Sequence, residues 1–193
     1  MDVEERTRYE RRKARTRHTL KEAAAALLVE KGYEALTIQD ITDRLDLARA
    51  TFYVHFKDKD DVIWSVLQDH FDALNEKVHT ELNTPSPGRH YQKLLHIFEY
   101  AAAQKALLSV MLSERGHIRL VQRFARYVAL IITQDMEQGF TPSMPGASVA
   151  FTAQFLAGAL IQVLTWWLES GEDLTPEQLT RMFYALEART NSA

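Results

Sequence analysis

The chain has 193 residues, 46% of them hydrophobic and none of them cysteine, so it can bury a core but has no disulfide, thiolate zinc site or cysteine nucleophile. Its net charge of −3 hides an asymmetry, because residues 6–21 hold eight Lys and Arg against one Glu, whereas residues 61–193 hold ten against fourteen Asp and Glu. A basic segment on an acidic body indicates a polyanionic partner at one end, although a solvated tail would show the same pattern.

The first predicted element is a helix from Lys13 to Lys31, where apolar residues recur at helical spacing. Gly32 follows where a C-cap is needed, because glycine adopts the left-handed conformation at little cost. The chain has only seven glycines and five prolines, which favours helix over strand. The apolar face of this helix carries Leu20, Ala24, Leu27 and Leu28.

Two short helices joined by a turn are predicted next. Thr37 can cap the first, with Asp40 three residues later as in a capping box, and this helix ends near Asp46. The second runs from about Arg49 to His55. The side chains expected to lock the pair together are Leu45, Leu47, Phe52 and Phe56. This arrangement is typical of a helix-turn-helix, although a helical corner with solvated charges is the alternative.

The second of these helices has two chemically distinct faces. Phe52 and Phe56 are four residues apart and take the inward face. The residues left on the outer and N-terminal surfaces are Arg49, Thr51, Tyr53 and His55. Arginine pairs with guanine edges, threonine contacts a thymine methyl group or a phosphate, and tyrosine or histidine donates to phosphate. We therefore expect this helix to enter the DNA major groove.

The rest of the chain is predicted to be helical as well. Asp58 begins a long fourth helix, and helical periodicity continues in pieces to about Gln138, with a break at Gly116. Thr175 begins the last helix with a capping box. Loops are expected where prolines and glycines gather, at residues 83–90, 139–148 and 170–178. No strand pattern stands out, so the predicted fold class is all-α.

Residues 147–168 contain no charged residue and form a run long enough to span a bilayer. Polar residues within the run and an acidic flank argue against a membrane span. A helix this apolar in a soluble protein is buried on most sides. We therefore expect it to pack, with the last helix, against the same helices of a second copy in a homodimer. The small residues that would allow close approach are Ala150, Ala153, Ala157 and Gly158.

Residues about 13–62 resemble the N-terminal DNA-binding domain of the TetR family of transcriptional regulators. The similarity runs through "TLKEAAAALLVEKGYEALTIQDITDRLDLARATFYVHFKDKDDVI", and its most specific piece is "ATFYVHFKDK". The resemblance implies a three-helix helix-turn-helix domain at residues 1–57, with a basic arm at residues 1–12. It also implies a larger helical effector-binding and dimerisation domain at residues 58–193.

The resemblance further implies roles for individual residues. Thr37 would cap its helix and touch a phosphate, and Gln39 would approach the DNA. Base edges or the sugar-phosphate wall would be met by Arg49, Thr51 and Val54, and phosphate or base by Tyr53 and His55. Lys59 would bind phosphate at the start of the fourth helix. Ala50 departs from the glycine that many relatives carry there, which limits the approach of the backbone slightly.

A sensor role for the C-terminal domain is also implied by the family. The candidate effector-pocket residues are Phe98, Tyr100, Met111, Phe124, Tyr127, Phe155 and Trp166, with ordinary core packing as the alternative for each. No charge cluster in the sequence indicates an acidic or a cationic effector. An effector that binds better when the recognition helices are misplaced would lower DNA affinity by its differential affinity alone.

The predicted function is a cytoplasmic transcriptional regulator, a repressor that binds a palindromic double-stranded operator as a homodimer and is released by a small-molecule effector. Neither a cofactor, a metal, a membrane nor a signal peptide is expected. An enzyme is disfavoured because phosphate-loop, serine-elbow and zinc-helix motifs are missing. His96 and Glu99 have metal-ligand spacing, but they are a single pair. A helical protein-interaction module without sequence-specific DNA binding is the alternative.

Overall fold

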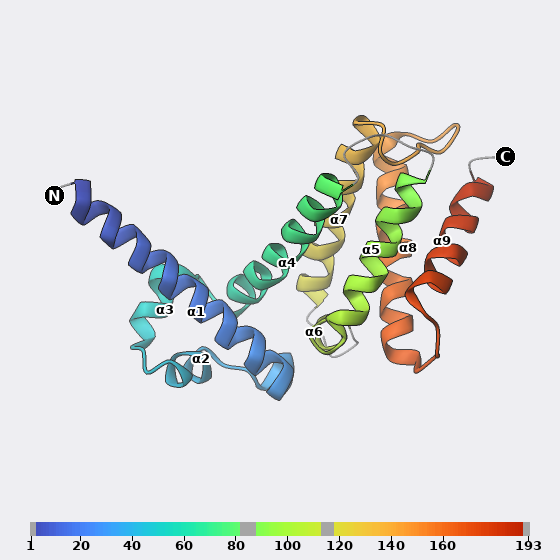
Figure 1. The fold of residues 1–193 in the computed structure, drawn as a ribbon. Coiled ribbons are helices and arrows are strands. Elements are labelled where there is room, and N and C mark those ends of the chain that lie inside the picture. Colours follow the sequence, from blue (N-terminus) through green and yellow to red (C-terminus); the bar gives the residue numbers. More distant parts are fainter. Residues whose placement is uncertain (1–2, 82–87, 113–117, 191–193) are drawn as a thin grey trace. The chain divides into compact units, whose positions relative to one another are not determined.

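The structure is a computed structural model that describes residues 3–81, 88–112 and 118–190. Within these ranges the chain is helical and has no strand, which confirms the all-α prediction (Figure 1). It divides into two compact units, Met1–Phe71 and Asp72–Ala193, each of which is described by itself. The expected boundary, between residues 57 and 58, lies just before the helix Lys59–Glu81, whereas the division between the two units falls within that helix. The break expected at Gly116 and most of the loop at residues 83–90 fall outside the described residues.

The N-terminal unit contains α1 (Val3–Ala35), α2 (Ile38–Arg44), α3 (Arg49–His55) and the first part of α4 (Lys59–Glu81). The structure continues α1 back to Val3, so the described part of the basic arm is helical. Gly32 interrupts α1 with a positive φ of 76°, as its place after Lys31 predicts. The largest fully buried side chains of this unit include Leu20, Leu28, Leu36, Ile41, Phe52, Phe56, Val62 and Ile63.

Local hydrogen bonds explain where the short helices begin. The Thr37 hydroxyl accepts from the Asp40 N–H (3.1 Å), and the Asp40 carboxylate accepts from the Thr37 N–H (2.9 Å), which confirms the capping box. Asp58 accepts from the Asp61 N–H at 2.8 Å and so caps α4. Asp46 turns the chain between α2 and α3 with φ 53°, a left-handed conformation that aspartate tolerates better than most residues.

The described residues of the C-terminal unit form five further helices and the end of α4. They are α5 (Arg89–Ala103), α6 (Lys105–Leu112), α7 (Ile118–Glu137), α8 (Val149–Ser170) and α9 (Pro176–Thr190). α7 and α6 pack against α8, and α5 packs against α9 (Figure 1). Ser148 caps α8 by accepting from the Phe151 N–H, and Gly171 ends that helix with φ 70°. Thr175 and Gln178 form the predicted capping box of α9.

Helix α8 is apolar enough and long enough to span a membrane, and it is the one described helix that meets both conditions. Its inward face is buried within the chain, and this face includes Leu156, Leu160 and Leu164. Ala153 and Ala157 are each 1% exposed, so they pack within the chain's own core. They are therefore not free for the close approach to a second copy that we expected of them. Ala150 and Gly158 remain on the exposed side.

Candidate nucleic-acid interface and ligand cavity

The face of α3 opposite the core is open to solvent. Phe52 is fully buried, whereas Tyr53 is 49% and Val54 62% exposed. Arg49 is also exposed, and its guanidinium donates to the Tyr53 hydroxyl at 3.1 Å. Thr51 is half-buried beside them. The helix thus presents one cation, one phenol and two small side chains on a firmly packed support, and these are groups that can bind base edges and phosphates.

Residues of α2 lie at the same helix-turn-helix. Thr37 and Gln39 are both exposed, and Gln39 donates to Asp43 one turn later. Asp40 holds Lys31 of α1 at 2.5 Å, and hydrogen bonds from Lys31 and Thr37 lower its pKa to about 2. The carboxylate is therefore charged at neutral pH, and it joins α1 to the start of α2.

Lys59 and His55 are less free than the sequence suggested. The Lys59 ammonium donates to the Tyr33 carbonyl at 2.8 Å and lies 4.1 Å from the centre of the Tyr33 ring. An ammonium has three donors, so this contact still leaves donors for a phosphate. His55 is half-buried, and burial, together with the charges of Arg17 and Lys13, lowers its pKa. Its imidazole is thus neutral at pH 7 in the absence of DNA.

Arg17 has a structural role that sequence patterns did not reveal. Its Nη1 donates to the His55 carbonyl at 2.6 Å, and its Nη2 donates to the Ser65 hydroxyl at 3.1 Å. Its guanidinium also lies 4.2 Å from the centre of the Phe56 ring. Arg17 therefore ties the C-terminal end of α3 to α1 and α4. In the sequence it is one of many cations in a basic stretch, and its partners lie 38 and 48 residues away.

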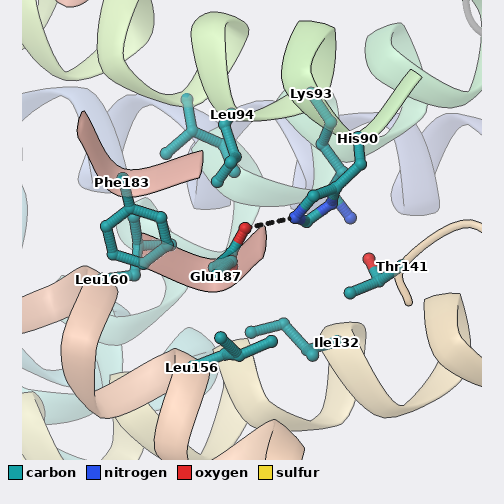
Figure 2. Close-up of a pocket in the computed structure, with 10 residues that line it drawn as sticks. His90, Lys93, Leu94, Ile132, Thr141, Leu156, Leu160, Phe183 and Glu187 are labelled. Atoms are coloured by element: carbon teal, nitrogen blue, oxygen red, sulfur yellow. Dashed lines mark hydrogen bonds and ion pairs between the residues drawn. The ribbon is translucent and has the colours of Figure 1, made fainter. Parts of the chain in front are cut away.

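The C-terminal unit contains a cavity that opens to solvent, and its empty space of about 330 Å³ includes part of that open solvent (Figure 2). It lies among α5, α7, α8 and α9 and the loop before α8. Its lining residues are His90, Lys93, Leu94, Ile97, Ile132, Thr141, Leu156, Leu160, Phe183 and Glu187. The polar members belong to a buried charge cluster, which no charge pattern in the sequence had indicated. The carboxylates and cations that pair here are far apart in sequence, which hides the cluster from pattern analysis.

The seven residues expected to form an effector pocket are dispersed in the structure, and none lines this cavity. Phe98, Met111 and Phe124 are buried core residues, whereas Tyr100 and Tyr127 are half-buried. The Tyr127 hydroxyl donates to Asp72. Phe155 is 50% and Trp166 45% exposed, and both lie on the outer face of α8.

Large apolar side chains are exposed on α8 and on α9. They are Val149, Phe151, Phe155, Trp166, Met182 and Leu186, and we call this set the α8–α9 face. Phe151, Phe155 and Trp166 are spaced so that they fall on one side of α8. Met182 and Leu186 share a side of α9, whereas Leu179 and Phe183 are buried. Groups of exposed apolar side chains are typical of interaction surfaces.

The pair with metal-ligand spacing, His96 and Glu99, lies beside a second carboxylate. His96 lies 3.3 Å from Glu81 and 3.4 Å from Glu99. Among the residues that the structure describes, no group of three or more side chains is placed to hold a metal ion.

Comparison with known proteins links both units to one kind of protein. Residues 20–65 match the family described as "Bacterial regulatory proteins, tetR family". Residues 89–187, about half of the chain, match "Transcriptional regulator C-terminal region". The first match contains the whole helix-turn-helix, and the second contains the whole cavity.

Individual relatives are also transcriptional regulators. The HTH-type transcriptional repressor KstR2 of Mycolicibacterium smegmatis is 32% identical over 189 residues, which cover 90% of this chain and 89% of KstR2. The uncharacterized HTH-type regulator YxbF of Bacillus subtilis is 26% identical over 182 residues, or 90% of this chain, but the chain spans only 45% of YxbF. The regulator FadR of Bacillus subtilis, solved in complex with stearoyl-CoA, shares the fold. Its TM-score is 0.63 at 19% identity, with 88% of this chain and 96% of FadR covered.

Proposed function

Because the chain belongs to the TetR family of bacterial transcriptional regulators, we propose that it is a repressor that binds a palindromic operator as a homodimer and leaves it when a small molecule binds. The observation that carries the proposal is the exposed face of α3 over a rigid core. Arg49, Tyr53 and Val54 project from this helix, while Phe52 and Phe56 fix it from below. Repression is supported by the similarity to KstR2, which is named a repressor.

The proposed DNA contacts combine the family resemblance with the exposure of individual side chains. Base edges are assigned to Arg49, Thr51 and Val54. Phosphates are assigned to Thr37, Tyr53 and Lys59, with Gln39 approaching from the start of α2. His55 is assigned a phosphate or a base as well, although its side chain is half-buried and its carbonyl accepts from Arg17. The cations of residues 6–21 other than Arg17 add a sequence-independent attraction to the phosphates.

The α8–α9 face is proposed as the dimer interface. Six large apolar side chains exposed on two consecutive helices are costly in water and favourable against a matching surface. A two-fold dimer presents the same patch from both subunits, so the face must be complementary to itself. Two recognition helices related by this symmetry would read two half-sites, which accounts for a palindromic operator. Phe155 and Trp166 are thereby assigned to the interface and not to the effector pocket.

The effector is proposed to bind in the C-terminal unit and to act on the DNA-binding unit by a population shift. A cavity lined by α5, α7, α8 and α9 supports this location. The FadR structure, which contains stearoyl-CoA, supports a small-molecule effector in this fold. We place the protein in the cytoplasm, where its operator is, and assign it no enzymatic activity.

Selection of bound duplexes from a random pool, with the purified full-length protein, tests the proposal. A palindromic consensus with two equal half-sites is the expected result. The same selection in the presence of a cell extract should lose the consensus if an effector is present in the extract. Recovery of no consensus at moderate salt would refute sequence-specific binding and favour the protein-interaction alternative.

A further inference from the structure

The cavity of the C-terminal unit has two chemically different ends. In Figure 2 the side chains of Leu94, Leu160 and Phe183 gather at one end. At the other end lie His90, Lys93 and Thr141, with the Glu187 carboxylate facing the His90 ring. A lining divided in this way suits a molecule with an apolar body and one polar group.

The polar end holds two cations, Lys93 and Arg89, that differ in their partners. Lys93 pairs with Asp135, which is 2% exposed and also lies 3.3 Å from His79. His90 pairs with Glu187 at 2.6 Å. Arg89, the preceding residue, is 4% exposed and has no carboxylate partner among the described residues. Its guanidinium instead lies 3.1 Å from the centre of the Phe140 ring, next to the cavity-lining Thr141.

Arg89 does not itself line the cavity, but it lies one turn of α5 before Lys93, which does. Burial, together with the nearby charge of Arg89, lowers the pKa of Lys93 to about 8. The two cations are therefore close enough to repel each other. In addition, Nη1 of Arg89 and Nδ1 of His90 are buried and have no hydrogen-bond partner among the described residues. Buried polar groups normally have a hydrogen-bond partner, and a ligand in the cavity would supply one here.

We propose that the cavity binds a small carboxylic acid with an apolar tail. The carboxylate would lie at the end formed by Arg89, His90 and Lys93, and the tail would lie against Leu160 and Phe183. A carboxylate adds a negative charge where a buried cation has no counter-charge, which offsets part of the cost of burying Arg89. An amine would add a further cation there, and an alcohol would leave the charge uncompensated. The identification of this acid as the effector rests on the proposed function, whereas its binding in the cavity does not.

Octanoate is a suitable probe, with 1-octanol and octylamine as matched neutral and cationic compounds. Calorimetric titration of the full-length protein should show saturable binding of octanoate. Octanol should bind about tenfold or more weakly, because a charge-assisted hydrogen bond contributes on the order of that factor or more. Octylamine should not bind. Equal binding of octanoate and octylamine, or no binding of octanoate, would overturn the inference.

Two variants separate the two ends of the cavity. Arg89→Gln should weaken octanoate binding about tenfold or more and leave octanol binding unchanged. Leu160→Phe adds volume at the apolar end and should abolish the binding of octanoate and of octanol. This variant tests the site independently of whether Arg89→Gln folds. Arg181→Gln changes an exposed arginine of α9 and serves as the control. Octanoate binding that survives Leu160→Phe would contradict the assigned site. Operator binding is measured separately, so failure of the acid to bind leaves the proposed function standing.

Discussion

Replacing Arg17 by methionine should loosen the recognition helix without removing any contact to DNA. The change removes a donor to the His55 carbonyl, a donor to the Ser65 hydroxyl and a cation stacked on Phe56. Hydrogen bonds from a charged group contribute about 1.5–3 kcal/mol, and a half-exposed cation–π contact about 0.5–2 kcal/mol. These contributions are not additive, and methionine recovers some packing. We therefore expect a loss of about 2–3 kcal/mol in the free energy of unfolding.

Operator affinity should fall together with this stability, by about tenfold or more, because the free protein no longer holds α3 in the binding position. Fluorescence anisotropy over a series of salt concentrations is the discriminating assay. A positioning residue leaves the slope of log K against log salt unchanged, whereas loss of a phosphate contact reduces it by about 0.9. Arg15→Met, which changes an exposed arginine two residues earlier, is the comparison, because it should reduce the slope and leave the stability unchanged. A reduced slope with unchanged stability in Arg17→Met would refute the positioning role.

Three further changes test other parts of the account. Arg49→Ala should cost about 1–3 kcal/mol of operator binding and relax selection at one base pair of each half-site, whereas an equal loss on every duplex would show that Arg49 contacts phosphate. Leu186→Asp should yield monomers in light scattering, while Arg181→Asp should stay dimeric; a dimeric Leu186→Asp would exclude the α8–α9 face as the interface. The pKa of His55 is lower in the folded chain than in the unfolded chain, so the unfolded chain binds a proton more readily. The contribution of His55 to stability is therefore present above pH 6.5 and is lost as the pH falls through the folded pKa. His55→Gln should flatten the pH dependence of denaturation below pH 6.5, and an unchanged curve would contradict that assignment.

The DNA-binding unit could be predicted because its signals are local. Thr37 and Asp40 are three residues apart and cap α2 with each other's side chains. Phe52 and Phe56 are four apart, and both are buried as their spacing predicts. Interactions of this range are visible in any short stretch of sequence. The bounds of α3 and the capping of α9 were predicted for the same reason.

Features that depend on distant residues could not be predicted. His90 and Glu187 are 97 residues apart, and neither carries a signal that it will be buried beside the other. The orientation of α8 was equally hidden, because a helix that is apolar on every side shows no preferred face. Ala153 and Ala157 accordingly turned inward, while Phe155 and Trp166 turned outward. Which aromatic residues belong to a pocket and which to an interface is decided by packing among several helices.

The most direct measurement compares two duplexes at about 150 mM salt, the palindrome recovered by selection and a scrambled duplex of the same composition. The account predicts that the purified protein binds the palindrome at least about 10³-fold more tightly, with one dimer per duplex. Equal affinity for the two duplexes would show that the protein binds DNA only through charge, and would contradict the assignment of α3 as a recognition helix.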